Sequence, residues 1–267
     1  MRNCLLAGIL LAVGTVATHA ADAVIAPQPE IQDQQRWHVI FSPYIWAASL
    51  NGTAGLYGYS TDVDIPFRDT LKNLDLTAMG NIEITNGVFG AYFDGQYTKT
   101  SQDESLLGHK LGLDVEATNL IGGVYYRLYE QKLEGTTTFG KQRVFAIEPT
   151  IGLRWTRLEA KLSSGPYSIT RKAEWLDPFI GSRFFYDIND RWNIFAEADI
   201  GGFGAGTRLS ANGQAYLGYR TFLFDVPTTL RVGYRVLYQD YKNDNIASRF
   251  KYDVTQHGPV VGLSMQF

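Results

Sequence analysis

LRVGYRVLY, residues 230–238, is the stretch that decides the fold, because its side chains alternate in character. One face carries apolar side chains and the other carries charges or glycine: Leu230, Val232, Tyr234 and Val236 against Arg231, Gly233 and Arg235. A repeat of two residues is that of a β-strand, whereas an amphipathic helix repeats every 3.6 residues. The stretch therefore predicts a strand with one apolar and one polar face.

Segments of the same kind recur from residue 37 to the last residue. The alternation predicts strands at Trp37–Ser49, Leu76–Thr85, Val88–Thr100, Leu111–Leu128, Val144–Leu158, Ala173–Asp187, Arg191–Phe203, Gln214–Phe224, Thr229–Tyr241 and Arg249–Phe267. About ten strands is an even number, as in single-chain bacterial membrane barrels. Eight strands is the alternative, since strand ends read from sequence shift by a few residues. We therefore expect an all-β fold: a single antiparallel transmembrane β-barrel.

The links between these segments alternate in length. Tight turns are predicted at Asn86-Gly87, Asn189-Asp190 and Asp225-Val226-Pro227, and Asn-Gly is the strongest hairpin signal. Longer links are predicted at Leu50–Asp75, Ser101–Lys110, Lys161–Arg171, Gly204–Gly213 and Lys242–Ser248. Short periplasmic turns and long outer loops are typical of membrane barrels. Tyr129–Gln142 breaks the alternation, so either that turn is extended or the register is shifted there.

The first residues have the layout of a secretory signal peptide. Arg2 precedes an apolar run at residues 4–16, and small residues before Ala20 and Ala23 offer two cleavage sites. We predict a signal peptide at residues 1–20, with cleavage after 23 as the alternative. A periplasmic tail at 21–35 and the barrel at 36–267 then follow. Cys4 is the only cysteine, so cleavage leaves no thiol for a disulfide or a metal.

The chain stops on Phe267, after a strand whose odd positions, Val261, Leu263 and Met265, are apolar. This ending resembles the C-terminal signal read by the outer-membrane insertion machinery. With the signal peptide and the even strand count, it predicts a Gram-negative outer membrane as the location. The expected partners are outer-membrane lipids and, during biogenesis, the insertion machinery. The net charge of −3 argues against binding to nucleic acid.

Four prolines stand inside predicted strands, where each removes a backbone donor from the ladder. They are Pro43, Pro149, Pro178 and Pro259. Near Pro259 the apolar face of the last strand also changes phase, from Tyr252 and Val254 to Val261 and Leu263. A β-bulge at this point would explain both facts.

If the apolar faces meet lipid, the opposite faces line the interior. These positions hold a predicted lumen charge network of both signs: Glu83, Asp94, Glu116, Glu148, Asp177, Glu197 and Asp199 with Arg154, Arg183, Arg220, Arg231 and Arg235. Such charges either line a narrow pore for small solutes or ions, or fill the interior as a packed network. We favour the packed network, because side chains fill a barrel of eight to ten strands.

The sequence gives no catalytic residues, no metal site and no cofactor. Beyond the predicted signal peptide the histidines are His38, His109 and His257, and none stands in a nucleophile elbow or a helical metal motif. His257 is interpreted as a turn or interface residue. Triads in barrels can combine distant strands, so a lipid-active outer-membrane enzyme stays an alternative.

The first long link contains a candidate helix. Phe67, Leu71 and Leu74 recur at helical spacing, and Pro66 is suited to open a helix. We expect a short helix that either caps the barrel mouth or packs on neighbouring loops.

Several motifs together resemble uncharacterised proteobacterial outer-membrane β-barrel proteins, of the small OmpA-type or porin-like kind. These are Ser42–Ala48, Val63–Asp69, Gly201–Gly204, Gly233–Arg235 and His257–Leu263. The resemblance covers nearly all of the chain after the predicted signal peptide. It implies fold and location but brings no substrate or catalytic residues. The functional hypothesis is a structural or narrow-pore barrel, with a lipid-active enzyme or a surface adhesion barrel as alternatives.

Overall fold

The computed structural model describes residues 37–56, 59–72, 74–106, 109–164, 167–243 and 250–267. The predicted signal peptide and the whole of the predicted periplasmic tail lie outside these ranges and stay predictions. The described residues form a thirteen-stranded antiparallel sheet and one short helix. Among them, no helix is both long enough and apolar enough to cross a bilayer.

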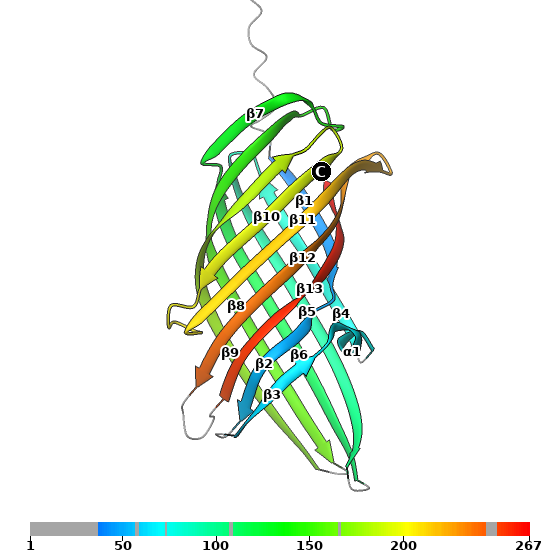
Figure 1. Cartoon of the computed structure of the whole chain (residues 1–267), viewed down its shortest axis with the longest axis vertical. Coiled ribbons are helices and arrows are strands. Elements are labelled where there is room, and N and C mark those ends of the chain that lie inside the picture. Colours follow the sequence, from blue (N-terminus) through cyan, green and yellow to red (C-terminus); the bar gives the residue numbers. More distant parts are fainter. Residues whose placement is uncertain (1–36, 57–58, 73, 107–108, 165–166, 244–249) are drawn as a thin grey trace, which may run out of the picture. The chain divides into compact units, whose positions relative to one another are not determined.

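Ten of the strands form a closed barrel (Figure 1). In chain order they are β1 (His38–Trp46), β4 (Leu74–Thr85), β5 (Phe89–Leu106), β6 (His109–Tyr126), β8 (Gln142–Ser164), β9 (Tyr167–Asp187), β10 (Trp192–Gly201), β11 (Leu209–Leu223), β12 (Val226–Asn243) and β13 (Phe250–Gln266). Consecutive members pair antiparallel, and β1 pairs with β13 to close the cylinder. The prediction of ten strands is confirmed, and the alternative of eight is wrong.

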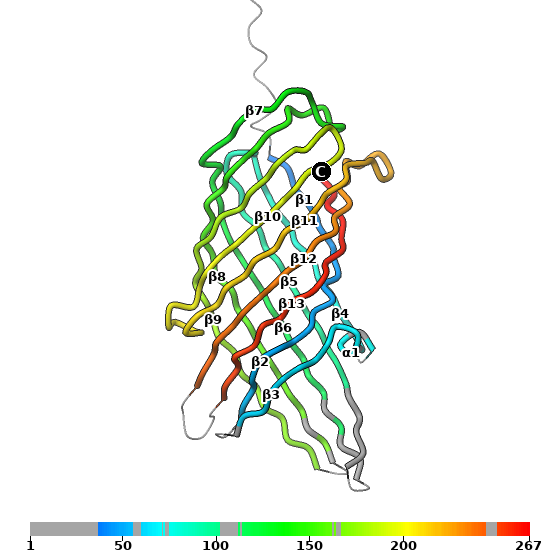
Figure 2. The backbone as a smooth tube through the Cα atoms, in the orientation of Figure 1, coloured from blue at the N-terminus to red at the C-terminus, as the bar shows by residue number. Residues whose placement is uncertain are grey.

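Three further strands lie in links where no strand was predicted. β2 (Ser49–Leu56) and β3 (Tyr59–Ile65) form a hairpin, and β2 continues the line of β1 along β13 (Figure 2). The register is shared, since Trp46 faces Val260 and Ser49 faces His257. The predicted short helix follows as α1 (Phe67–Lys72).

The long link on the short-turn side is an extended turn. It contains β7 (Tyr129–Thr136), which pairs with β8. The alternative of a shifted register is therefore wrong.

Two of the predicted outer loops are strand instead. β5 and β6 stay paired up to Leu106 and His109, and β8 and β9 up to Ser164 and Tyr167. The alternation rule ended these strands too early, because a backbone ladder in water needs no apolar face. The end of the barrel with these long hairpins is called the hairpin end. The opposite end, with Phe267 and the turn at Asn86, is called the turn end.

The predicted bulge near Pro259 is wrong. β12 and β13 keep one register from Thr228 opposite Met265 to Asn243 opposite Phe250. Tyr252, Val254 and Val260 all point into the barrel, so the strand does not turn over. The apparent change of phase arises because the inner face itself is apolar toward the hairpin end.

The four strand prolines share a position in the ladder. Pro43 is the last residue of β1 in register with β4. The last β9–β10 pair is Phe179 with Gly201, and Pro178 is the next residue of β9 toward the hairpin end. Pro149 lies on β8 between its pairing with β6 and with β7, and Pro259 lies on β13 between its pairing with β1 and with β2. Each proline therefore stands where a strand partner ends or changes, which is where a missing N–H costs least.

The outer wall carries a continuous band of exposed apolar side chains. Members on every side of the barrel include Phe41, Ile82, Phe93, Val124, Ile151, Ile180, Ile194, Val232 and Val261. Toward the hairpin end the band stops at the outward-facing charges Arg157 and Glu174, which stand opposite each other on β8 and β9. Exposed apolar surface of this extent belongs in a bilayer, which makes this a transmembrane barrel.

Replacing Ile180 by arginine tests this band. Ile180→Arg should lower the free energy of unfolding by about 2–4 kcal/mol, because it places a charge near the middle of the apolar band. The measurement is urea unfolding in lipid vesicles. Thr170→Arg, on the same face of β9 beyond the band, is the matched control and should change little. Equal effects at the two positions would contradict the assignment.

Candidate functional site: the barrel interior

The inner face of the barrel holds all but one of the predicted lumen charges. Buried or nearly buried on this face are Glu83, Asp94, Glu148, Arg154, Asp177, Arg183, Glu197, Asp199, Arg220, Arg231 and Arg235. The exception is Glu116, which the sequence placed inside. On β6 the buried positions are Asn119, Ile121 and Tyr125, so Glu116 faces outward, 3.2 Å from Lys99 of β5. Glu116 lies in the stretch of β6 beyond the apolar band, where an outward charge meets water.

Arg183 organises one group of charges in the half of the barrel toward the turn end. One guanidinium nitrogen lies 3.1 Å from Glu83 Oε2, and Nε lies 3.4 Å from Glu148 Oε2. The same guanidinium stacks 3.8 Å from the ring centre of Tyr125, whose hydroxyl donates to Glu83. Arg127 reaches Glu148 from the rim, at 2.7 Å. One cation is thus held by two carboxylates and an aromatic face.

The middle of the barrel is crossed by a second set of contacts. Arg154 and Asp199 form an ion pair of 2.7 Å whose side chains are 0% and 1% exposed. Asn212 donates to the second Asp199 oxygen at 2.8 Å and accepts from Arg235 Nε at 3.1 Å. Arg235 also lies 3.6 Å from Asp94. Strands from opposite sides of the barrel are therefore joined across the lumen.

Neutral polar side chains complete these contacts. Tyr44 donates to Asp94 at 2.9 Å, and Gln214 donates to Glu197 at 2.9 Å. Gln239 donates to Thr156, which donates to Asn119. These residues were not predicted, because only charged side chains were assigned to the lumen. The alternation that located the charges would have located them as well.

Two other arginines also point into the interior. Arg220 forms an ion pair with Asp187, which was not among the predicted lumen charges. Asp187 also accepts from Val144 N at 2.9 Å. Arg231 stacks on the ring of Phe195, 5.5 Å from its centre.

Toward the hairpin end the interior becomes apolar and aromatic. Trp46, Leu237 and Val260 pack together on the hairpin-end side of the charges. Beyond them Trp175 stacks on Tyr241 with ring centres 4.3 Å apart, and Tyr252 and Val254 pack against Trp175. The inside therefore has two layers, a charged one and an aromatic one, and side chains occupy both.

His257 lies on the outer surface, away from this network. Its Nδ1 is 2.6 Å from the Tyr234 hydroxyl, and its Nε2 is 2.8 Å from Asn51 Oδ1. The contacts match the interface role expected for it and bring it no nucleophile. Within the described ranges, no group of three or more His, Cys, Asp or Glu side chains is placed to hold a metal ion.

The predicted loop cap is only partly described. Phe67 begins α1, where its backbone N–H donates to Ser49 Oγ at 3.0 Å, and its side chain is largely exposed. The side chains of Leu71 and Leu74, and that of His109, lie outside the described residues. Capping of the barrel mouth therefore stays a prediction, as does the role of Phe267 as an insertion signal.

No protein-family model matches the chain, and no curated protein matches it by sequence. Solved structures similar to it include Ail, the attachment invasion locus protein of Yersinia pestis, at 14% identity and a TM-score of 0.38, covering 86% of this chain and 98% of that one. Neisserial surface protein A is similar at 11% identity and a TM-score of 0.31, covering 86% and 97%. A FadL homologue of Pseudomonas aeruginosa is similar at 9% identity and a TM-score of 0.24, covering 86% and 89%. At such low TM-scores the likenesses support no conclusion about this chain.

Fold and interior together define a class: a ten-stranded transmembrane β-barrel with charged and aromatic side chains on its inner face. The resemblance to uncharacterised proteobacterial barrels stays a prediction, because no family model matches.

The buried pair of Arg154 and Asp199 allows a direct energetic test. Arg154→Met should lower the free energy of unfolding by about 3–5 kcal/mol, because it leaves a buried carboxylate without its cation. Adding Asp199→Asn should restore most of the loss. Denaturant unfolding in vesicles measures both variants.

Lys172→Met is the matched control, since Lys172 pairs with Glu159 at 2.9 Å in an exposed position. An exposed pair contributes about 0–1 kcal/mol. An Arg154→Met loss as small as this would show that the inner pair is solvated and the lumen open.

Proposed function

We propose that the protein is an outer-membrane β-barrel whose lumen is closed to solutes, so that it acts through its wall and its outer end. The single observation that carries the closed lumen is the Arg154–Asp199 pair, which is buried at the middle of the barrel. Burial to this degree is what a packed interior, and not a water-filled pore, requires of the two side chains. A barrel of this strand number is one whose interior side chains can fill.

The outer membrane is supported by the architecture. An even number of antiparallel strands, short turns at one end and long hairpins at the other are the habit of outer-membrane barrels. The predicted signal peptide and the terminal Phe267 agree with that location. Because the short turns of such barrels face the periplasm, the turn end would face the periplasm and the hairpin end would project from the cell.

A second candidate is a surface role of the hairpin end. The β8–β9 hairpin extends past the apolar band, and at its tip Tyr167 is 79% and Ile169 is 57% exposed. Exposed apolar residues on a projecting sheet suit contact with another surface. The enzyme alternative has no comparable support, because His257 contacts only Tyr234 and Asn51 in the described hydrogen bonds.

Single-channel recording in planar bilayers tests the closed lumen. The wild-type barrel should show no steady ion conductance. Arg154→Ala combined with Arg235→Ala should create conducting steps, because the change removes two side chains that cross the lumen. The control is Arg157→Ala with Lys172→Ala, which removes two cations from the outer face and should stay silent. Steady conductance by the wild-type protein would contradict the proposal and favour a narrow pore.

A further inference from the structure

The barrel wall is incomplete on one side of the hairpin end. Pairing of β9 with β10 ends at Phe179 and Gly201, and pairing of β11 with β12 ends at Leu209 and Asp240. β9 and β12 continue past these points, each with a described partner on its other side only. Figure 1 shows both strands running on beyond the β10–β11 loop. The opening between Glu174–Pro178 of β9 and Tyr241–Asn243 of β12 is called the wall notch.

A loop tied down by hydrogen bonds forms the floor of the notch. Gly202 N donates to Pro178 O at 3.0 Å on one side, and Arg208 N donates to Asp240 O at 2.8 Å on the other. Thr207 donates from its N–H and its hydroxyl to Asp177 Oδ1, at 2.7 and 2.9 Å. Gly202 has a φ of 90°, and a Cβ there would lie 2.2 Å from Thr207 Oγ1. The hydrogen bonds of this loop therefore fix the shape of the wall notch.

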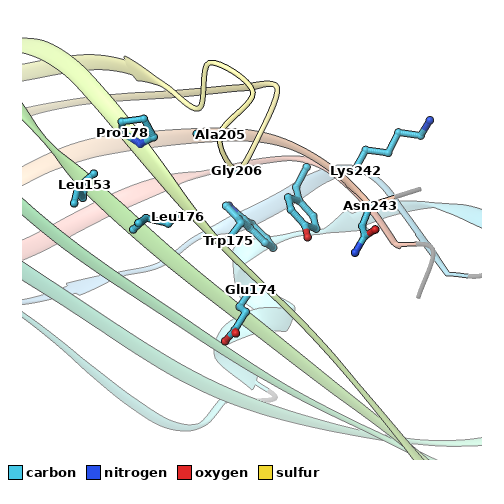
Figure 3. A pocket seen from close by; sticks show the side chains of 10 residues that line it. Leu153, Glu174, Trp175, Leu176, Pro178, Ala205, Gly206, Lys242 and Asn243 are labelled. Atoms are coloured by element: carbon cyan, nitrogen blue, oxygen red, sulfur yellow. The ribbon is translucent and has the colours of Figure 1, made fainter. Parts of the chain in front are cut away.

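The notch is an open hollow of about 630 Å³ (Figure 3). Its lining changes character from the wall to the rim. Leu153, Leu176 and Pro178 line the wall side, and the stacked Trp175 and Tyr241 line the inner side. Glu174, Lys242 and Asn243 line the rim. A volume of this size falls in the usual range of small-molecule sites, roughly 300–1,000 Å³.

The level of the hollow indicates what fills it. Leu153 and Leu176 are 50% and 47% exposed on the outer wall, at the edge of the apolar band. The next outward residue along β9 is Glu174, where the band stops. The mouth of the notch therefore opens at the boundary between the hydrocarbon and the polar region of the bilayer. The ligand available at this level is the alkyl chain of a lipid.

A buried polar atom also lacks a partner here. Trp175 is 4% exposed, and its indole N–H has no hydrogen-bond acceptor among the described residues. A buried tryptophan N–H ordinarily finds an acceptor. Because this nitrogen is itself covered, an oxygen of a bound head group or ester reaches it only when the Trp175–Tyr241 stack shifts.

We propose that the wall notch binds one membrane lipid, with its acyl chain against Leu153, Leu176 and the Trp175–Tyr241 stack and its polar head toward Glu174, Lys242 and Asn243. The inference rests on the proposed membrane residence. It gives the wall of a closed barrel a site that loads sideways from the leaflet and not through the lumen. The occupant is a lipid and not a water-borne apolar solute, because the mouth adjoins the apolar band.

Native mass spectrometry of the full-length barrel, released from nanodiscs of phosphatidylethanolamine and phosphatidylglycerol, tests the site. The wild-type barrel should keep one lipid after the annular lipids are stripped. Ala205→Trp fills the mouth from the loop and should lower the retained lipid by roughly tenfold, the loss expected when about two methylene groups lose apolar contact. Ala198→Trp, outward on β10 below the notch, is the matched control and should keep the lipid.

Heat-modifiable migration on gels reports whether each variant has folded. If Ala205→Trp does not fold, Leu176→Ser serves in its place and should also release the lipid. Equal retention by all the folded barrels, or retention by none, would overturn the notch while leaving the membrane barrel intact. Binding of the dye N-phenylnaphthylamine that phospholipid does not displace would overturn the lipid as occupant. Failure of the wild-type barrel to enter nanodiscs would overturn the membrane proposal itself.

Discussion

Closure of the sheet between its first and last strands is the constraint on which the rest of the structure depends. Val39 and Phe267 exchange both backbone hydrogen bonds, at 3.1 and 2.9 Å, and the β1–β13 register runs from there to Trp46 opposite Val260. In hydrocarbon an unpaired strand edge costs several kcal/mol for each polar group. Closure satisfies those groups, and it assigns each side chain to the lipid or to the lumen.

The two environments account for the positions of the charges. On the strands that cross the apolar band, charged residues such as Arg154 and Asp199 point inward and bind one another. Once a strand passes the band, its outward face takes charges freely, as Arg157, Glu159 and Lys172 show. The interior follows a separate order, with charges toward the turn end and aromatic side chains toward the hairpin end. The wall notch opens at the aromatic layer, so an apolar ligand there meets apolar side chains.

The alternation of residues was enough to predict the strand number and nearly all of the inner charges. It failed for Glu116 because alternation gives two faces but does not say which is inner once both are polar. The β5–β6 and β8–β9 extensions escaped prediction because strands paired in water need no apolar face for the alternation to reveal. The aromatic layer around Trp175 was missed because apolar residues were assigned to lipid throughout. The wall notch follows from unequal strand lengths around the barrel, which local sequence does not encode.

Disulfide cross-linking between the first and last strands tests closure most directly. In a chain with Cys4→Ser, the pair Phe41→Cys and Met265→Cys places thiols on directly opposed residues of β1 and β13. The Cα atoms of opposed residues lie about 4.5–5.5 Å apart in antiparallel sheets, which suits a disulfide. The account predicts that this pair oxidises in membranes as completely as Tyr97→Cys with Thr118→Cys on β5 and β6. Oxidation of the β5–β6 pair without the β1–β13 pair would show an open sheet and contradict the barrel.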